Sequence, residues 1–348
     1  MFVSDFDYDL PPHLIAQEPA SERGASRLMV LDRHAGSTHA GVIADLPGWL
    51  RRGDLLVVND TRVFPARLMG RRVPSGGMVE CLLLRRIDDA RWDALVHPGQ
   101  KLKPGRGFRC EGPGGVIAGE ILAQHTFGRR TIRLWAPNGG DVDAIIDAIG
   151  HMPLPPYIKR NDTSEDRDRY QTIFARARGS VAAPTAGLHF TAALLDTLDR
   201  QGVERVAITL HVGYGTFKPV RTAVVEEHRV DPERFVIHEA ASAAINGALD
   251  EGRRVVAVGT TTARALESAA IEGAGRVAAG AGETSLFIYP SFRFQVIRGL
   301  LTNFHLPRSS LLFLICAFGG RENVLAAYRR AVEEDFRFYS YGDAMLVL

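Results

Sequence analysis

The stretch VVAVGTTTARALES, residues 255–268, decides the fold class of this 348-residue chain. Four apolar residues typical of a buried strand lead through Gly259 into three threonines, and an alanine-containing helical pattern follows. The same alternation continues on both sides. Helical patterns occupy residues 189–202, 239–252 and 321–335, and strand-like runs occupy residues 203–215, 284–290 and 300–304. Strands separated by helices predict a largely parallel, helix-covered sheet.

One of these helices carries clear boundary signals. In residues 189–202, Thr191 is a suitable N-cap, and Gly202 suits the position just after the last helical turn. A further apolar run at residues 55–58 is followed by an Asn-Asp-Thr turn cluster. The α/β pattern therefore begins within the first 64 residues and resumes after the proline-rich segment HMPLPPYIKR, residues 151–160.

The intervening residues 65–150 have a different texture. Short strand-like stretches are separated by turns rich in Gly, Pro and Asp, which is typical of a small antiparallel barrel or sandwich. We therefore predict one mixed, largely parallel α/β body from residues 1–64 and 151–348, into which residues 65–150 are inserted as a β-rich block, either a barrel or a sandwich. Between residues 65 and 110, ten Arg and Lys residues stand against four acids. That excess suits either a solvated face or a phosphate-contacting patch.

Composition limits the classes of function. The chain is 46% hydrophobic and 24% charged, as in a globular protein. Its N-terminus lacks the features of a signal peptide, and no apolar stretch reaches the roughly 18–20 residues that span a bilayer, so we expect a cytoplasmic protein. Three dispersed cysteines argue against a disulfide framework, a zinc knuckle or a radical iron–sulfur site. The net charge of +2 does not by itself indicate a nucleic-acid partner.

Polar residues cluster where the predicted strands end, which is where open α/β sheets bind ligands. The turn at residues 259–262 places backbone N–H groups and threonine hydroxyls at a helix N-terminus, which is a natural anion site, although ordinary capping explains it equally well. This turn matches neither the dinucleotide fingerprint nor the P-loop. His189, after a Gly/Pro-rich loop that includes Thr185, suits proton transfer or a purely structural hydrogen bond.

The remaining polar loops are equally ambiguous. Residues 211–218 combine a histidine, aromatics, a hydroxyl and a lysine, which either hold a purine and an anion or form a glycine turn with a solvated lysine. The polar residues 59–62, which follow the apolar run at 55–58, fit an Asx-type turn. Glu283 is a lone carboxylate of the kind usually found at the surface. Aromatic residues at 336–341 are either buried or available to stack on unpaired bases. The polar residues 302–310 interrupt an apolar run and predict an exposed loop at the crevice.

Nine segments, taken in order, give a more specific indication. Four of them read GDLLVVNDTRVFPARL, LHVGYGTFKPV, VVAVGTTTARALES and LLTNFHLPRSSLLFLICAFGG, and the others lie at residues 9–33, 154–160, 168–191, 284–294 and 336–346. Together they resemble the S-adenosylmethionine:tRNA ribosyltransferase-isomerase family of queuosine synthesis. The chain departs from the family pattern at residues 231–235, at Ser291, where glycine is usual, and at Arg298, where an acid is common.

The resemblance implies a discontinuous α/β catalytic domain, residues 1–64 and 151–348, with an inserted β-barrel domain at residues 65–150. It also implies an activity on tRNA. The family transfers and isomerises the ribosyl part of S-adenosylmethionine onto 7-aminomethyl-7-deazaguanine at the wobble position, which gives epoxyqueuosine-tRNA and releases adenine and methionine. S-adenosylmethionine is a co-substrate there, and we expect no cofactor, no metal and a monomer. The alternative is a catalytically inactive tRNA-binding protein on the same scaffold.

That chemistry states what the site must contain. A base has to accept a proton acidified by the sulfonium. The methionine carboxylate needs a cation or a helix N-terminus. The sulfonium and adenine favour aromatic faces such as Tyr214 and Phe217. We expect His189 or His305 to move protons. The predicted catalytic residues are His189, His305 and His211. The predicted substrate-binding residues are Asn59, Thr61, Arg62, Thr185, Tyr214, Thr216, Lys218, Gly259, Thr260, Thr261, Glu283, Asn303 and Arg308.

Overall fold

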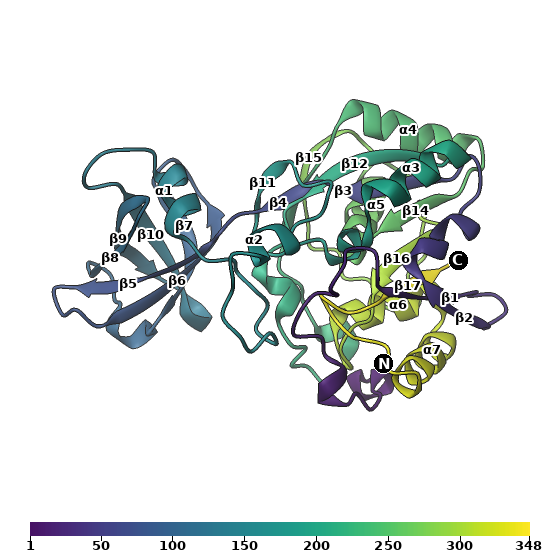
Figure 1. Ribbon diagram of the computed structural model, residues 1–348, viewed down its shortest axis with the longest axis horizontal. Helices are drawn as coiled ribbons and strands as arrows, with labels where there is room; N and C mark the ends of the chain where they lie inside the picture. Colours follow the sequence, from purple (N-terminus) through teal and green to yellow (C-terminus); the bar gives the residue numbers. More distant parts are fainter.

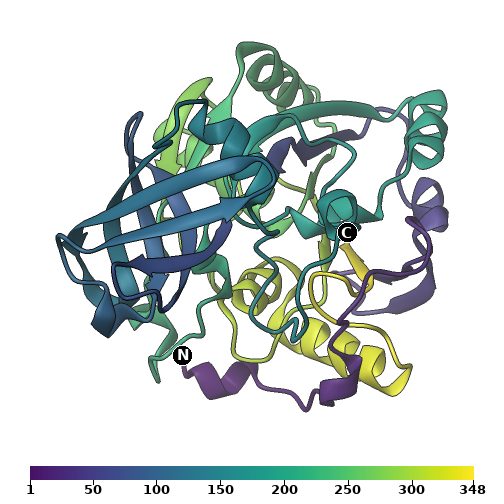
Figure 2. The same cartoon turned by 60° about the vertical axis from the view of Figure 1, so that its left-hand side comes forward.

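The structure is a computed structural model that describes residues 1–348, apart from the side chain of Phe217. Two bodies stand side by side: a six-stranded barrel and a larger layered α/β body (Figure 1). Figure 2 shows the barrel from the front, with the N-terminal and C-terminal segments both belonging to the larger body. This arrangement confirms the predicted fold class, an α/β sheet with an antiparallel barrel.

A nine-stranded mixed sheet forms the centre of the α/β body. In spatial order its strands are β15 (Gly280–Thr284), β13 (Glu233–Ile237), β12 (Glu204–Leu210), β3 (Leu55–Asn59), β14 (Val255–Val258), β16 (Gly299–Asn303), β17 (Ala344–Val347), β1 (Arg27–Leu31) and β2 (Thr38–Val42). The central strands β12, β3, β14 and β16 are parallel, whereas β17 runs antiparallel to β16 and parallel to β1. The carboxyl ends of the four central strands therefore meet at one edge.

Helices cover both faces of this sheet. Alternate residues of β3 show why: Leu55 and Val57 pack with α4 (Glu239–Asp250), α5 (Thr260–Glu272), α6 (Ser310–Gly319) and α7 (Arg321–Glu333), while Leu56 and Val58 pack with α3 (Ala192–Gln201). Side chains alternate between the two faces of a strand, so a strand buried on both faces must be apolar throughout.

None of the helices that the structure describes is long and apolar enough to cross a membrane by itself. Helices α6 and α7 together have the length and composition of a membrane span, but they are bent by 116° at the break between them.

Local sequence signals account for most of these elements. In α3 the hydroxyl of Thr191 accepts a hydrogen bond from the amide of Leu194, and Gly202 takes a left-handed conformation after the last turn, as predicted. The strand predicted at residues 284–290 is wrong, because β15 ends at Thr284. The following segment is held by side chains instead: Leu286 donates its amide to the Thr284 hydroxyl and its carbonyl accepts from Arg264.

The barrel is closed and entirely antiparallel. Its strands, in spatial order, are β10 (Arg129–Trp135), β7 (Arg91–His97), β6 (Met78–Arg86), β5 (Arg67–Val73), β8 (Gly107–Gly112) and β9 (Gly115–Gln124). Closure leaves no free strand edge, and helix α1 (Val142–Ile149) packs its isoleucines into the barrel core. The exact domain boundaries at residues 64 and 151 stay a prediction.

Two short strands mark where the chain enters and leaves the barrel. Strand β4 (Thr61–Val63) precedes it, and β11 (Ala177–Ser180), which follows helix α2 (Asp166–Arg169), pairs with β4 in parallel. Short 3-10 helices complete the chain: η1 (Val3–Phe6), η2 (Pro12–Leu14), η3 (Ile43–Gly48), η4 (Gly99–Lys101), η5 (Thr126–Gly128), η6 (Thr185–His189), η7 (Tyr214–Phe217) and η8 (Val225–Glu227).

Candidate functional site

A cavity of about 50 Å³ lies at the carboxyl ends of the central strands. Five separate segments build its wall: residues 182–186, 212–216, 259–261, 302–311 and 339–340. Two of these segments directly follow or end parallel strands, β14 and β16, so the cavity stands where ligands bind in open α/β sheets. Seven of the predicted site residues line it: Thr185, Thr216, Gly259, Thr260, Thr261, Asn303 and His305.

Helix α5 points its N-terminus at the cavity. Gly259 has φ +95°, a conformation that glycine adopts freely, and turns the chain sharply from β14 into the helix. The hydroxyl of Thr262 donates to the carbonyl of Val258 at 2.7 Å, while Thr260 and Thr261 line the cavity. The first amides of a helix have no carbonyl partner within it, and the helix dipole favours negative charge there. This end of the cavity therefore suits a carboxylate or a phosphate.

His305 faces the cavity and is firmly held. Its Nε2 lies 2.9 Å from the Thr302 hydroxyl, its amide donates to the hydroxyl of Tyr328 at 3.2 Å, and its carbonyl accepts from the hydroxyl of Tyr8. Burial lowers the pKa of His305 to about 3. The imidazole is therefore neutral near pH 7, and so low a pKa also makes it a weak base while the cavity stays closed.

His189 lies behind the cavity wall and not in it. Its Nδ1 is 2.9 Å from the hydroxyl of Ser26, and burial lowers its pKa to about 4, an effect that the neighbouring Asn303 side chain partly opposes. His189 Nε2 and Asn303 Oδ1 make no other hydrogen bond among the described residues, and the Asn303 side chain acts as an acceptor toward His189. Asn303 thus stands between the histidine and the cavity, with its amide donating to the Tyr339 carbonyl at 2.9 Å.

A buried ion pair supports the part of the cavity wall formed by residues 212–216. Arg264 on α5 and Glu233 on β13 meet at 2.6 Å, with exposed side-chain fractions of 8% and 4%. The second carboxylate oxygen of Glu233 accepts hydrogen bonds from the amide of Gly213 (2.9 Å) and the hydroxyl of Thr216 (3.0 Å). Glu233 consequently fixes the loop that carries Thr216 into the cavity.

Comparison with known proteins decides the family. A sequence model described as "Queuosine biosynthesis protein" matches residues 3–347. The chain belongs to this family. It is 52% identical to the S-adenosylmethionine:tRNA ribosyltransferase-isomerase of Heliobacterium modesticaldum and 50% identical to that of Syntrophotalea carbinolica, over the full length of each chain. It also resembles the crystal structure of S-adenosylmethionine tRNA ribosyltransferase from Thermotoga maritima, with 36% identity, a TM-score of 0.56, and coverage of 99% of this chain and 100% of that chain.

Three predicted site residues of this family member join strands beneath the cavity. The side-chain oxygen of Asn59 accepts from the amides of Thr61 and Leu210, and its NH₂ group donates to the Leu210 carbonyl at 2.9 Å. The Thr61 hydroxyl lies 2.8 Å from Nδ1 of His211. Burial lowers the pKa of His211. These contacts are structural, and a role for Asn59, Thr61 and His211 in binding or catalysis stays a prediction.

Four other predicted residues lie at the surface, away from the cavity wall. Lys218 pairs with Asp231 at 2.6 Å, and Arg308 pairs with Asp7, so Arg308 does not face the cavity beside His305 as expected. Arg62 and Glu283 are exposed on β4 and the edge strand β15. The side chain of Phe217 lies outside the described residues. No lysine or arginine is among the residues that line the cavity, so α5 is its source of positive potential.

Sequence reasoning missed the residues that hold the site together. Arg264 lies in a helix that is buried almost all round, and a charged residue there demands a partner. Glu233 belongs to residues 231–235, the segment that departs from the family pattern. The alternation along β13 offered a signal. Glu233, Phe235 and Ile237 are buried and alternate with outward residues, so the Glu233 carboxylate had to lie on the buried side of the strand. Tyr339 and Ser340, from the C-terminal aromatic segment, also line the cavity.

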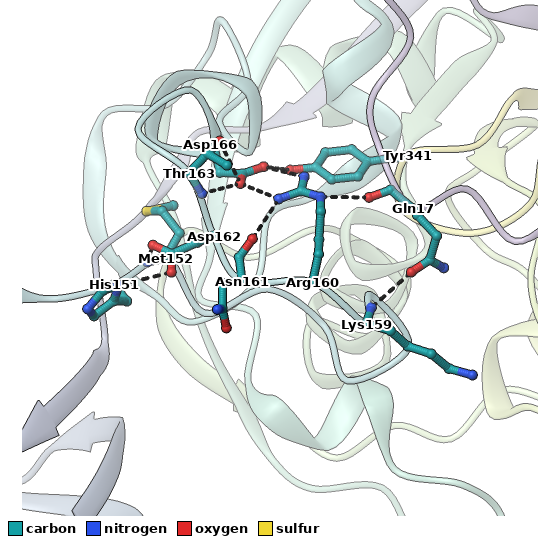
Figure 3. Close-up of polar contacts among 10 residues, drawn as sticks. All are labelled: Gln17, His151, Met152, Lys159, Arg160, Asn161, Asp162, Thr163, Asp166 and Tyr341. Carbon is teal, nitrogen blue, oxygen red and sulfur yellow. Dashed lines mark hydrogen bonds and ion pairs between the residues drawn. The ribbon is translucent and has the colours of Figure 1, made fainter.

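The chain that returns from the barrel is tied to the α/β body by a polar network (Figure 3). Arg160 forms two hydrogen bonds to Asp166, at 2.7 and 2.9 Å, and its Nε donates to the Gln17 carbonyl. Burial alone would raise the pKa of Asp166, but hydrogen bonds from Arg160, from the Thr163 amide and from the Tyr341 hydroxyl outweigh it and lower the pKa to about 2. The network fixes one wall of a second groove, which Tyr214 also lines.

Among the described residues no three His, Cys, Asp or Glu side chains gather in a group that could hold a metal ion. Whether the reaction needs a cofactor stays a prediction.

Proposed function

We propose that this protein is an S-adenosylmethionine:tRNA ribosyltransferase-isomerase, which forms epoxyqueuosine-tRNA from tRNA that carries 7-aminomethyl-7-deazaguanine. The observation that carries the proposal is the full-length match to relatives of that name at about half identity. The cavity supports it, because five of the family segments converge there although they are far apart in the chain. The comparisons give no support to an inactive tRNA-binding protein.

The cavity supplies groups that the reaction requires. The N-terminus of α5 suits the methionine carboxylate, since Lys218 and Arg308 are engaged elsewhere. Tyr339 offers an aromatic face to the sulfonium or to adenine. Of the two histidines expected to move protons, His305 is the one in contact with the cavity, so we assign it the removal of the proton beside the sulfonium. The side-chain oxygen of Asn303, which faces His189, keeps a second lone pair that suits an amine donor of the adenine or of the deazaguanine.

Binding must widen the cavity. A volume of about 50 Å³ holds a few water molecules, whereas sites for drug-sized ligands measure roughly 300–1,000 Å³. The wall at residues 212–216 is anchored by Glu233, so we assign the movement to residues 182–186 on the facing side. We further propose that the protein works as a cytoplasmic monomer, because its tRNA substrate is in that compartment and one chain supplies the whole cavity wall.

The decisive experiment uses defined substrates. The protein is incubated with S-adenosylmethionine and tRNA that carries 7-aminomethyl-7-deazaguanine, and the products are separated by liquid chromatography with mass detection. Free adenine, methionine and an epoxyqueuosine nucleoside are expected in equal amounts. S-adenosylhomocysteine would instead indicate methyl transfer, and tRNA binding without turnover would favour the inactive alternative. Tritium exchange from the 5′ carbon of S-adenosylmethionine, lost in His305→Gln, tests the role of the histidine.

A further inference from the structure

Phe127 is the most exposed large hydrophobic residue of the described chain. Its exposed fraction is 84%, whereas that of Trp135, another aromatic residue of the barrel, is 38%. Its backbone is left-handed, with φ 51° and ψ 38°, which is rare for a bulky residue and costs on the order of 1 kcal/mol. Neither burial nor backbone preference accounts for a phenylalanine at this position. An external ring-binding partner would account for it.

Two open grooves meet at this ring. The interdomain groove, about 570 Å³, runs between barrel and α/β body and is lined by Arg67, His97, Phe127, Lys159, Arg160 and Tyr214, among others. The barrel groove, about 1,180 Å³, is lined by Lys101, Lys103, His125, Phe127 and Arg130, among others. Phe127 and Gly128 belong to both, so the two grooves form one strip along the barrel.

The strip passes beside the candidate active site, because adjacent parts of the same two segments line the groove and the cavity. Val181 and Tyr214 line the interdomain groove, and the neighbouring Ala182 and Thr216 line the cavity. On the α/β side, the guanidinium carbon of Arg221 lies 5.9 Å from the centre of the Phe127 ring. A chain that places one unit in the cavity can therefore continue along the groove to the ring.

The charge of the strip is positive. Six of its lining residues are Arg or Lys. Two of them are neutralised, because Arg67 pairs with Glu80 and Arg160 pairs with Asp166, both at 2.7 Å. The other four are Lys101, Lys103, Arg130 and Lys159. The guanidinium of Arg130 is buried without a carboxylate partner and donates to the carbonyls of Gly99, Leu102 and Arg129. A positive groove with an exposed aromatic ring is the arrangement that binds single-stranded nucleic acid, whose backbone follows the charge and whose bases stack on the ring.

We infer that Phe127 stacks on an unpaired nucleotide of the RNA loop that carries the target base, and that Lys101 and Lys103 contact the phosphates beside it. The inference rests on the proposed function for the identity of the RNA, but not for the binding itself. Base stacking on an aromatic side chain is worth roughly 1–3 kcal/mol, so removing the ring should weaken binding roughly 5- to 150-fold.

The test measures binding of the full-length protein to a labelled RNA hairpin with a seven-nucleotide loop and to a blunt RNA duplex of equal length. Phe127→Ala should weaken hairpin binding by the stated factor and leave duplex binding unchanged, and Phe127→Trp should bind the hairpin as the wild type does. Ile87→Ala, at another exposed apolar residue of the barrel, serves as the control and should change neither. Thermal unfolding verifies that all variants are folded.

Salt dependence separates the ring from the charges. The slope of log Kd against log salt concentration should be unchanged in Phe127→Ala and lower by about one in Lys103→Gln. The control Arg329→Gln, on the exposed face of α7 far from the barrel, should retain the wild-type slope (Figure 1). Wild-type hairpin affinity in Phe127→Ala, or an equal loss for hairpin and duplex, would overturn the inference. Absence of turnover in the wild type would refute the proposed function alone, since these binding data do not depend on catalysis.

Discussion

The ion pair between Glu233 and Arg264 offers a test of how the cavity wall is fixed. Breaking a buried pair by removing one partner leaves an uncompensated charge and costs about 3–5 kcal/mol of folding free energy. Glu233→Gln leaves Arg264 charged in the core, because a guanidinium does not lose its proton. The glutamine oxygen can still accept from Gly213 and Thr216, so nearly all of the loss in this variant comes from the charge. Arg264→Met leaves the Glu233 carboxylate unpaired and also removes the donor to the Leu286 carbonyl, a loss that is common to the single and double variants and so cancels in the coupling energy.

The double variant Glu233→Gln/Arg264→Met separates charge from packing. It removes both charges and keeps the acceptor for the loop, so its unfolding free energy should lie above that of either single variant, with a coupling energy of about 2 kcal/mol or more. Urea unfolding followed by circular dichroism measures the four free energies. The double variant should also retain ribosyl transfer better than either single variant. Additive losses, or single variants within about 0.5 kcal/mol of wild type, would refute the reasoning.

Three further predictions concern the histidines and one turn. The folded-state pKa values of His305 and His189, about 3 and about 4, lie below the ordinary value near 6.5, so the unfolded chain binds more protons. The contribution of these histidines to the unfolding free energy is complete above pH 6.5 and decreases as the pH falls toward 4 and then 3. At pH 5 the decrease is about 2 kcal/mol per histidine. Urea titrations at pH 8 and pH 5 should therefore show a smaller loss of unfolding free energy in His305→Gln than in the wild type. His305→Gln should lower kcat at least about 100-fold, and His189→Gln should lower it less, because only His305 lines the cavity. Single-turnover assays measure both variants, and equal losses would contradict this placement. Ser291→Gly should raise the unfolding free energy by about 0.5–1 kcal/mol, because Ser291 is exposed at φ 84°, whereas Ser291→Ala should give no gain.

The strand–turn–helix periodicity was sufficient to predict the layered α/β body and the edge of the sheet at which the cavity lies. Residues 255–268 show why: apolar continuity in β14 requires burial on both faces, and the helix that follows must then return over the sheet. The turn texture of residues 65–150 likewise predicted an antiparallel barrel or sandwich, and the resemblance to the family chose the barrel. Periodicity could not predict the partners of single charges. Arg308 and His305 are three residues apart in one loop, yet one forms a surface ion pair and the other lines the cavity.

Asn59 and Asn303 show what separates a binding residue from a structural one. Both are buried asparagines at the carboxyl ends of central strands, and the sequence gives the same reason to choose either. The side-chain oxygen of Asn59 already accepts two backbone hydrogen bonds, so it has little to offer a ligand. Asn303 lines the cavity, and its side-chain oxygen accepts no backbone hydrogen bond and faces His189. An amide oxygen has two lone pairs, so this oxygen can still accept a hydrogen bond from a ligand N–H group. That difference in hydrogen bonding, which appears only in three dimensions, makes Asn303 the better candidate of the two for contact with a substrate donor.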